Sequence, residues 1–239
     1  IQAEYLDARK VIKTNKEFGS AKVNFNITDH LLQEHYKNKK GTVQIVTGFI
    51  AADVGGLTTT LGRGGSDYTA AIIAAALNAE VLEIWTDVDG VLTCDPRKVK
   101  KAFTLPTLSY AEAMEMSHFG AKVIYPPTIQ PAFRKGIPIY IKNTFNPNFV
   151  GTLIANNVNQ ENDKTIKGIT SLNNIALLRI QGSGIIGVPG VSARLFSALG
   201  KGKINVILIT QASSEHSICI AVTEKEAITA KENIEAEFQ

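Results

Sequence analysis

The segment LGRGGSDYTA, residues 61–70, constrains the fold of this chain more than any other, because it places three glycines before a predicted helix. Glycine adopts positive φ without strain and lets a ligand approach the backbone. The three are Gly62, Gly64 and Gly65. After them, either Ser66 or Asp67 can cap an apolar helix over residues 68–78. The segment therefore predicts a tight loop that leads directly into a helix.

This loop has the composition of an anion site. The helix dipole, unpaired N–H groups and the Arg63 guanidinium can converge on a carboxylate or phosphate. An ordinary glycine-rich turn explains the same residues equally well. Two familiar phosphate loops are excluded: the lysine of a Walker loop is missing, and the dinucleotide fingerprint would place Asp67 at its third glycine.

A second segment, EIWTDVDGVLTCDPR at residues 83–97, follows a predicted buried strand over residues 81–85. Thr86 and Asp87 then fall at the carboxyl end of that strand, where open α/β sheets bind ligands. With Arg97 on the loop beyond, these side chains can hold the sugar and phosphates of a nucleotide.

The acidic residues of this segment also have a simpler interpretation. Asp89-Gly90 and Asp95-Pro96 are typical turn sequences, so Asp89 and Asp95 are explained equally well as turn or cap residues. For Asp87 this interpretation is the weaker one.

A third segment, SHFGAKVIYPP at residues 117–127, follows a short helix predicted over residues 111–119. Gly120 suits the left-handed end of that helix, which places Lys122 just beyond its terminus. On its own, a lysine there is best explained as a favourable charge for the helix dipole.

Taken together, four segments closely resemble the aspartate kinases of the amino acid kinase family. They are LDARKVIKT, TTTLGRGGSDYTAA, EIWTDVDGVLTCDPR and FGAKVIYP, in the family's order. The resemblance implies an aspartate-binding segment made of Arg63, Gly64, Gly65 and Ser66, with Arg63 on a substrate carboxylate. Asp67 is implied as an organising acid in the catalytic centre.

The same resemblance implies an ATP site. Its residues are Thr86, Asp87, Leu92, Arg97, Lys122 and Val123. Lys122 is also implied to stabilise the phosphoryl group during transfer. Family members usually have tyrosine where this chain has Leu92, so one expected nucleotide contact is missing, and many have histidine at Tyr125. We expect Mg²⁺ to arrive with ATP, because Asp67 and Asp87 do not form a dedicated metal cage.

Family members open with a strand that ends in a Lys-Phe-Gly-Gly motif, whose lysine and glycines contact the phosphates. No such segment occurs in this chain, which begins at Ile1. The resemblance therefore implies a fragment with little kinase activity of its own.

Composition limits the partners. The 239 residues carry a formal net charge of +3 and 44% hydrophobic residues, enough for packed cores. The basic residues are scattered, so we expect no nucleic-acid partner. No apolar run approaches the ~18 to 20 residues of a membrane span, which predicts no membrane partner and a cytoplasmic protein. Cys94, Cys219 and the four histidines lack zinc spacing, so no metal site is expected.

Strands and helices alternate through the first part of the chain. We expect strands over residues 18–26, 43–50 and 137–142 and a helix over residues 29–36. This order predicts an α/β sandwich with a largely parallel sheet, here a partial amino acid kinase domain over residues 1–155. Residues 156–166 are polar and amide-rich and are predicted to be a linker.

Residues 167–239 are predicted to form a second domain. Strands over 175–181, 205–210 and 217–223 and helices over 191–199 and 225–238 give five of the six elements of a ferredoxin-like unit. The sixth, a closing strand, is absent. The stretch resembles an ACT domain, most closely in the threonine-regulated aspartate kinase–homoserine dehydrogenase group. That implies an α+β domain that is incomplete here, a homo-oligomer formed through ACT domains, and Gln211 as an effector-binding residue.

The residues themselves support an effector site less strongly. Residues 182–190 form a glycine-rich loop before a helix, which can receive a carboxylate, and Asn205 and Gln211 offer amide hydrogen bonds. Plain loop glycines and capping amides explain the pattern at least as well. Lysine-sensing relatives tend to carry an acidic residue at Ile207, so the resemblance favours threonine as the effector over lysine.

The function expected is transfer of the γ-phosphoryl of ATP to the β-carboxylate of L-aspartate, giving 4-phospho-L-aspartate, with feedback regulation by an amino acid. One alternative is a non-catalytic, amino-acid-binding regulatory fragment. A third is a kinase for another acidic amino acid, such as glutamate or N-acetylglutamate.

Overall fold

The computed structural model describes residues 2–39, 41–118, 125–156, 166–182, 188–211 and 217–238. The chain divides into two compact units, Ile1–Ser171 and Leu172–Gln239, and each is described by itself. No helix among the described residues is both long and apolar enough to cross a membrane.

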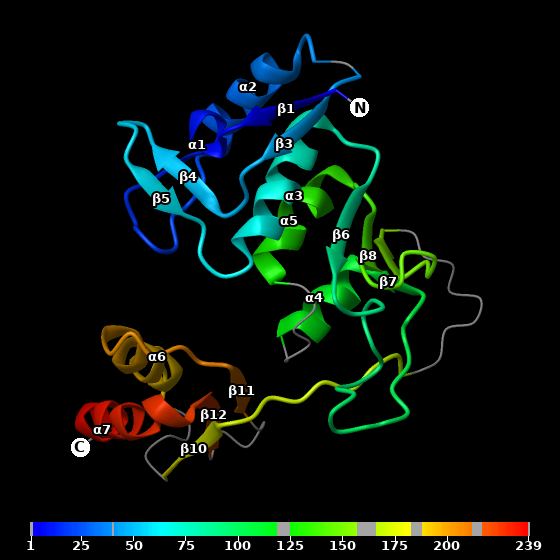
Figure 1. Ribbon diagram of the computed structural model, residues 1–239. Coiled ribbons are helices and arrows are strands. Elements are labelled where there is room, and N and C mark those ends of the chain that lie inside the picture. Colours follow the sequence, from blue (N-terminus) through cyan, green and yellow to red (C-terminus); the bar gives the residue numbers. More distant parts are fainter. Residues whose placement is uncertain are drawn as a thin grey trace. The chain divides into compact units, whose positions relative to one another are not determined.

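The first half of unit 1 contains short strands and two helices (Figure 1). The elements are β1 (Ala3–Leu6), α1 (Ala8–Val11), β2 (Lys13–Thr14), α2 (Phe25–Tyr36), β3 (Val43–Val46), β4 (Ile50–Asp53) and β5 (Thr58–Thr60). Strands β1 and β3 pair in parallel, while β4 pairs in parallel with β2 and antiparallel with β5. These pairings bring residues 47–49, between β3 and β4, to the start of the next helix.

The second half of unit 1 is a four-stranded sheet covered by helices. The elements are α3 (Gly65–Leu77), β6 (Leu82–Thr86), β7 (Thr107–Ser109), α4 (Tyr110–His118), α5 (Pro126–Lys135), β8 (Ile139–Asn143) and β9 (Thr152–Ala155). The strand order is β6-β8-β9-β7. Among the described residues of this unit, four of the six strand pairings are parallel, which confirms the largely parallel α/β prediction.

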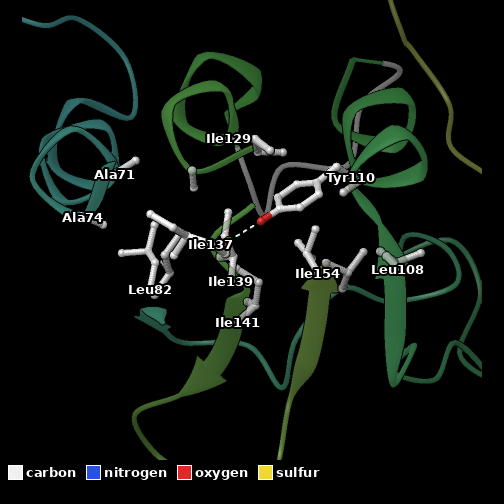
Figure 2. Packing of buried hydrophobic residues seen from close by; sticks show 14 of the residues in the cluster. Ala71, Ala74, Leu82, Leu108, Tyr110, Ile129, Ile137, Ile139, Ile141 and Ile154 are labelled. Carbon is white, nitrogen blue, oxygen red and sulfur yellow. Dashed lines mark hydrogen bonds between the residues drawn. The ribbon is translucent and has the colours of Figure 1, made fainter. Parts of the chain in front are cut away.

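One face of this sheet forms the core (Figure 2). Isoleucines of β8 and β9 pack against Ala71 and Ala74 of α3 and against Ile129 of α5. The ring of Tyr110, the first residue of α4, is buried, and its hydroxyl donates to the carbonyl of Ile137. Burial raises the pKa of this phenol to about 12. The core therefore fixes α3, α4 and α5 on the same face as the buried side chains of the strands.

Helix α3 is built for close packing. Its sequence GSDYTAAIIAAAL is rich in alanine, the best helix former, and several of its alanines are buried. Gly64 at the N-cap and Asn78 at the C-cap both adopt the left-handed conformation, with φ of 67° and 49°. Small side chains let α3 pack against both α5 and α2. The glycine-rich loop is thereby held at the end of a rigid helix.

A buried hydroxyl joins three segments of unit 1. Thr152 Oγ1 accepts from the backbone N–H of Val91 at 2.8 Å and donates to the carbonyl of Leu105 at 2.6 Å. A Cβ on Gly90, whose φ is 121°, would lie 2.5 Å from the same oxygen. The turn predicted at Asp89-Gly90 is thus fixed against β9.

Unit 2 consists of a three-stranded antiparallel sheet and two helices. Its elements are β10 (Ile175–Gln181), α6 (Val191–Lys201), β11 (Leu208–Gln211), β12 (Ser217–Thr223), a 3-10 turn (Glu224–Glu226) and α7 (Ala227–Phe238). The order β10-β12-β11 and the buried face against α6 and α7 match the predicted ferredoxin-like arrangement. The strand predicted over residues 205–210 begins later, at Leu208.

The strand predicted over residues 18–26 is wrong. Only an isolated bridge forms at Val23, and α2 begins at Phe25. The alternation of Val23, Phe25 and Ile27 imitates a strand. However, the Asn24 side chain accepts from the N–H of Ile27 at 3.3 Å and caps the helix.

The single strand predicted over residues 43–50 is two strands. Phe49 adopts φ of 72°, an uncommon value for a residue with a side chain, and so turns the chain between β3 and β4. Its carbonyl accepts from the N–H of Leu61 at 2.9 Å. The turn brings Phe49 to the glycine-rich loop, which a continuous strand would not.

We predict that Thr152→Val lowers the free energy of unfolding by about 1–3 kcal/mol, because the isosteric valine leaves the Val91 N–H and the Leu105 carbonyl without this partner. Urea unfolding followed by circular dichroism measures the change. The matched control is Thr60→Val on β5, whose hydroxyl makes no hydrogen bond to the residues that the structure describes. Equal losses in both variants would contradict the role of the buried hydroxyl.

Candidate active site

The glycine-rich loop packs too closely for side chains at two of its positions. A Cβ on Gly64 would lie 2.7 Å from Cβ of Tyr125, and a Cβ on Gly65 would lie 2.8 Å from Cδ2 of Phe49. Gly62 and Gly64 have φ of 77° and 67°. Gly62 and Gly64 thus adopt the positive φ that the sequence predicts, whereas Gly65 does not and is required for space alone.

The predicted helix cap is wrong. Gly64 is the N-cap of α3, so Ser66 and Asp67 lie inside the first turn. Their backbone N–H groups occupy positions that have no partner within a helix. Ser66 Oγ donates to Asp67 Oδ1 at 3.3 Å. Without a side-chain cap, the start of α3 keeps N–H groups available for an anion.

Arg63 stands at this helix start. Its side chain is exposed, and it makes no hydrogen bond or ion pair with any residue that the structure describes. Asp67 is half-buried, and the loss of solvent raises the pKa of its carboxyl, partly offset by the hydroxyl of Ser66. The loop thus combines one unengaged cation, free N–H groups and one partly desolvated acid.

Sequence reasoning missed three residues of this site. Thr69 is buried, accepts from the N–H of Phe49 at 3.0 Å and donates to the carbonyl of Gly65 at 2.7 Å. A Cβ on Gly48 would lie 3.1 Å from Ser66. The dipeptide Gly48-Phe49 therefore forms one wall of the loop. The Thr-Gly-Phe sequence was the available signal, but assigning residues 43–50 to one strand concealed it.

The second group of predicted residues begins at the carboxyl end of β6. Thr86 Oγ1 donates to Asp87 Oδ1 at 3.1 Å, and the Thr86 carbonyl accepts from the N–H of Thr144 at 2.8 Å. Asp89 Oδ1 accepts from the side-chain amides of Asn143 and Asn146 at 2.8 and 3.2 Å. Asp89 thus stabilises the turn after β8 through these two hydrogen bonds, whereas the side chain of Asp87 is exposed.

Residues 92–103 form a loop that we call the nucleotide loop, after the ATP-binding role that the resemblance implies for Arg97. Leu92 bridges to Thr104, and the N–H of Thr93 donates to the carbonyl of Phe103 at 2.9 Å, which closes the neck of the loop. Inside it, Asp95 accepts from Nε and Nη2 of Arg97 at 3.0 and 2.8 Å. Asp95 Oδ1 also accepts from the backbone N–H of Arg97. Asp95 therefore both stabilises the turn, through the backbone N–H of Arg97, and orients the Arg97 guanidinium.

Two predicted residues, Lys122 and Val123, lie outside the described part of the chain. The next described residue, Tyr125, packs on Gly64, so the end of this segment meets the glycine-rich loop. No hydrogen bond among the described residues links the glycine-rich loop to Thr86, Asp87 or Arg97. The described residues also contain no group of three or more acidic, histidine or cysteine side chains arranged to hold a metal ion.

In unit 2, Gln211 ends β11 beside the start of α6. Ser192 Oγ donates to Gln211 Oε1 at 3.5 Å, and the N-cap of α6 is Gly190 with φ of 90°. Asn205 is exposed and precedes β11. The described contacts join Gln211, but not Asn205, to the first turn of α6.

The sequence profile of the amino acid kinase family matches residues 1–143, and that of an ACT domain matches residues 178–238. The chain belongs to the amino acid kinase family and carries an ACT domain.

Within this family, the chain is similar to curated aspartokinases. A bifunctional aspartokinase/homoserine dehydrogenase of Haemophilus influenzae is 53% identical over 199 residues, which cover 83% of this chain and 24% of that protein. The lysine-sensitive aspartokinase 3 of Escherichia coli is 40% identical over 224 residues, covering 93% of this chain and 49% of that protein. The chain thus spans about a quarter to a half of these relatives.

The fold is also similar to solved structures of an aspartokinase. Escherichia coli aspartokinase III in complex with lysine and aspartate matches 93% of this chain and 49% of its own, with 38% identity and a TM-score of 0.70. The same enzyme in complex with aspartate and ADP matches all of this chain and 70% of its own, with 28% identity and a TM-score of 0.66.

We predict that Arg97→Lys and Arg97→Ala both raise the pKa of the Asp95 carboxyl from about 2 towards 3.8, because the hydrogen bonds of the guanidinium are the main cause of its low value. Carboxyl chemical shifts between pH 3 and 5 report the change. A depressed pKa means that this interaction stabilises the fold above pH 3.8 and is lost as pH falls towards 2. An unchanged Asp95 titration in Arg97→Lys would show that charge alone sets the pKa.

Proposed function

We propose that the protein transfers the γ-phosphoryl of ATP to the β-carboxylate of L-aspartate, giving 4-phospho-L-aspartate. The observation that carries this proposal is the start of α3. There the unengaged Arg63 directly precedes the helix, and the N–H groups of Ser66 and Asp67 have no partner within it. An Arg fork beside helix N–H groups suits a carboxylate. The aspartokinase relatives supply the identity of the acid.

The chemistry needs no general base, because a carboxylate is already ionised at neutral pH. Catalysis then rests on positioning and on neutralising charge in the transferring group. Arg63 and the first turn of α3 hold aspartate. Asp67 organises this loop through Ser66. Lys122 carries the charge that stabilises the phosphoryl group.

The nucleotide half is assigned to the end of β6 and the nucleotide loop. Thr86 and Asp87 would bind the sugar of ATP and Arg97 its phosphates, and Leu92, Lys122 and Val123 complete the ATP-binding set that the resemblance implies. Mg²⁺ would enter bound to ATP, where its chemistry is neutralisation of phosphate charge. Asp87, which is exposed at the end of β6, would offer a carboxylate oxygen to such an ion.

Two other functions compete. A non-catalytic regulatory fragment would bind an effector amino acid without phosphorylating anything. A kinase for glutamate or N-acetylglutamate would use the same loop on a longer acid. Phosphoryl transfer from radiolabelled ATP to each acid, measured on the natural gene product that contains this chain, separates the three.

Unit 2 is proposed to bind an allosteric amino acid, with threonine favoured over lysine, and to support a homo-oligomer. Ile207 leaves a lysine ammonium without a charged partner at that position. Gln211, held beside Ser192 at the start of α6, can hydrogen-bond to a ligand carboxylate, ammonium or hydroxyl.

We predict that Arg63→Ala raises the aspartate KM about tenfold or more and leaves the ATP KM near its original value, because a bidentate carboxylate clamp is lost. Lys122→Met should instead lower kcat about 10²-fold, as expected for removal of a donor aimed at the transition state. Steady-state kinetics of the natural gene product measure both. Arg63→Lys, which keeps the charge without the fork, and Lys37→Met, an exposed lysine after α2, are the controls. An unchanged aspartate KM in Arg63→Ala would refute the clamp.

We also predict that Gln211→Ala weakens threonine binding by about 1–3 kcal/mol while phosphoryl transfer stays intact, because one ligand group is left unpaired. Calorimetry with threonine and with lysine gives the affinities, and Gln130→Ala, an exposed amide on α5, is the control. Tighter binding of lysine, or equal threonine affinity in both variants, would count against this effector assignment.

A further inference from the structure

A short segment before unit 2 runs along the nucleotide loop. We call residues 166–171 the strap; they are the last residues of unit 1 and continue into Leu172. The backbone N–H of Ile169 donates to the carbonyl of Thr93 at 2.8 Å. Lys98 Nζ donates to Ser171 Oγ at 2.8 Å. The strap therefore contacts the nucleotide loop at two points, one before and one after Arg97.

The other end of the strap is fixed to α4. Lys167 Nζ lies 2.8 Å from Glu112 Oε1, in a pair whose side chains are 19% and 32% exposed. Glu112 Oε2 also accepts from the backbone N–H of Ser109 at 2.7 Å, so the carboxylate itself is held in place. This pair anchors the strap to the helix that precedes the segment carrying Lys122.

Gly168 makes the close approach possible. A Cβ at this position would lie 2.7 Å from Cε of Met116 and 3.1 Å from the carbonyl oxygen of Thr93. The strap backbone is thus packed between α4 and the neck of the nucleotide loop. Any larger residue would have to displace one of the two.

The neck of the loop depends on these contacts. Thr93 donates its N–H to the carbonyl of Phe103 and accepts at its own carbonyl from the N–H of Ile169, so the strap is bonded to the residue that closes the neck. Arg97 is oriented by Asp95, two residues away in the same loop, and so moves with it. The contacts that hold the loop, including those with the strap, therefore determine the position of the Arg97 guanidinium relative to the end of β6.

We propose that residues 166–171 are positioning residues for nucleotide binding, acting through the carbonyl of Thr93 and the ammonium of Lys98. The proposal rests on the nucleotide role of Arg97 put forward above. It gives these residues a role in the site even though none of them is placed in contact with substrate.

Ile169→Pro against Ile169→Ala is the test, on the natural gene product that contains this chain. Both lose the exposed isoleucine side chain, which is 67% exposed, but only proline also removes the N–H. We expect Mg-ADP affinity, measured by calorimetry, to fall about twofold to tenfold in Ile169→Pro and to stay unchanged in Ile169→Ala. The aspartate KM should be unchanged in both, which a general loss of structure would not allow.

A second pair keeps the test decisive if proline prevents folding. Ser171→Ala removes one acceptor of Lys98, whereas Ser171→Thr keeps a hydroxyl there. The alanine variant alone should lose ADP affinity, about twofold to fivefold. Equal ADP affinities within each folded pair would overturn the proposal.

The titration reads binding without turnover, so it separates two failures. ADP binding without phosphorylation of aspartate would refute the proposed reaction and leave the strap testable. Absence of ADP binding in the unmodified protein would refute the nucleotide site, and the strap proposal with it.

Discussion

The close packing around the first turn of α3 is the constraint on which the glycine-rich loop, the proposed aspartate site, depends. Phe49 and Tyr125 lie where side chains on Gly65 and Gly64 would have to be. Because both positions lack a Cβ, two segments distant in sequence come against the helix start, and Thr69 fixes one of them through its buried hydroxyl. The same absence of side chains leaves N–H groups open at the helix start.

The proposed nucleotide half is held in a different way. There, backbone groups of turns are satisfied by single side chains: Thr152 for Val91 and Leu105, and Asp95 for Arg97. Each side chain replaces a ladder hydrogen bond that irregular backbone cannot make. Loops held in this way can be irregular enough to surround a ligand and still be fixed to the sheet.

Much of this arrangement could be predicted from sequence. The strand β6 and the helix α3 follow from a short apolar run and an alanine-rich stretch, and the sequence of unit 2 gives its elements in order. Where the prediction failed, a local pattern favoured the wrong structure. The alternation of residues 23–27 imitates a strand, and nothing local reveals the positive φ of Phe49.

The contacts that sequence could not supply are those between distant segments. Thr152 is 61 residues from Val91, and Ser171 is 73 residues from Lys98. The sequence spacing of these pairs does not reveal the contacts. Each contact forms only because the fold of the sheet and its loops brings distant segments together. Site residues were therefore predicted from motifs, whereas the residues that hold them were not.

The strap bears on how unit 2, with the regulatory role proposed for it, can affect the proposed nucleotide site. Its last residue, Ser171, bonds to the nucleotide loop, and the next residue, Leu172, belongs to unit 2. A conformational change of unit 2 that moves Leu172 would therefore act first on the hydrogen bonds of Ser171 and Ile169, and then on the ion pair of Lys167 with Glu112 on α4. Since a change of one or two hydrogen bonds is comparable to a typical allosteric coupling of about 1–3 kcal/mol, release of this strap alone is large enough to alter nucleotide affinity. Regulation through the strap would thus need no rearrangement of the glycine-rich loop, whose contacts with Phe49, Thr69 and Tyr125 do not include the strap.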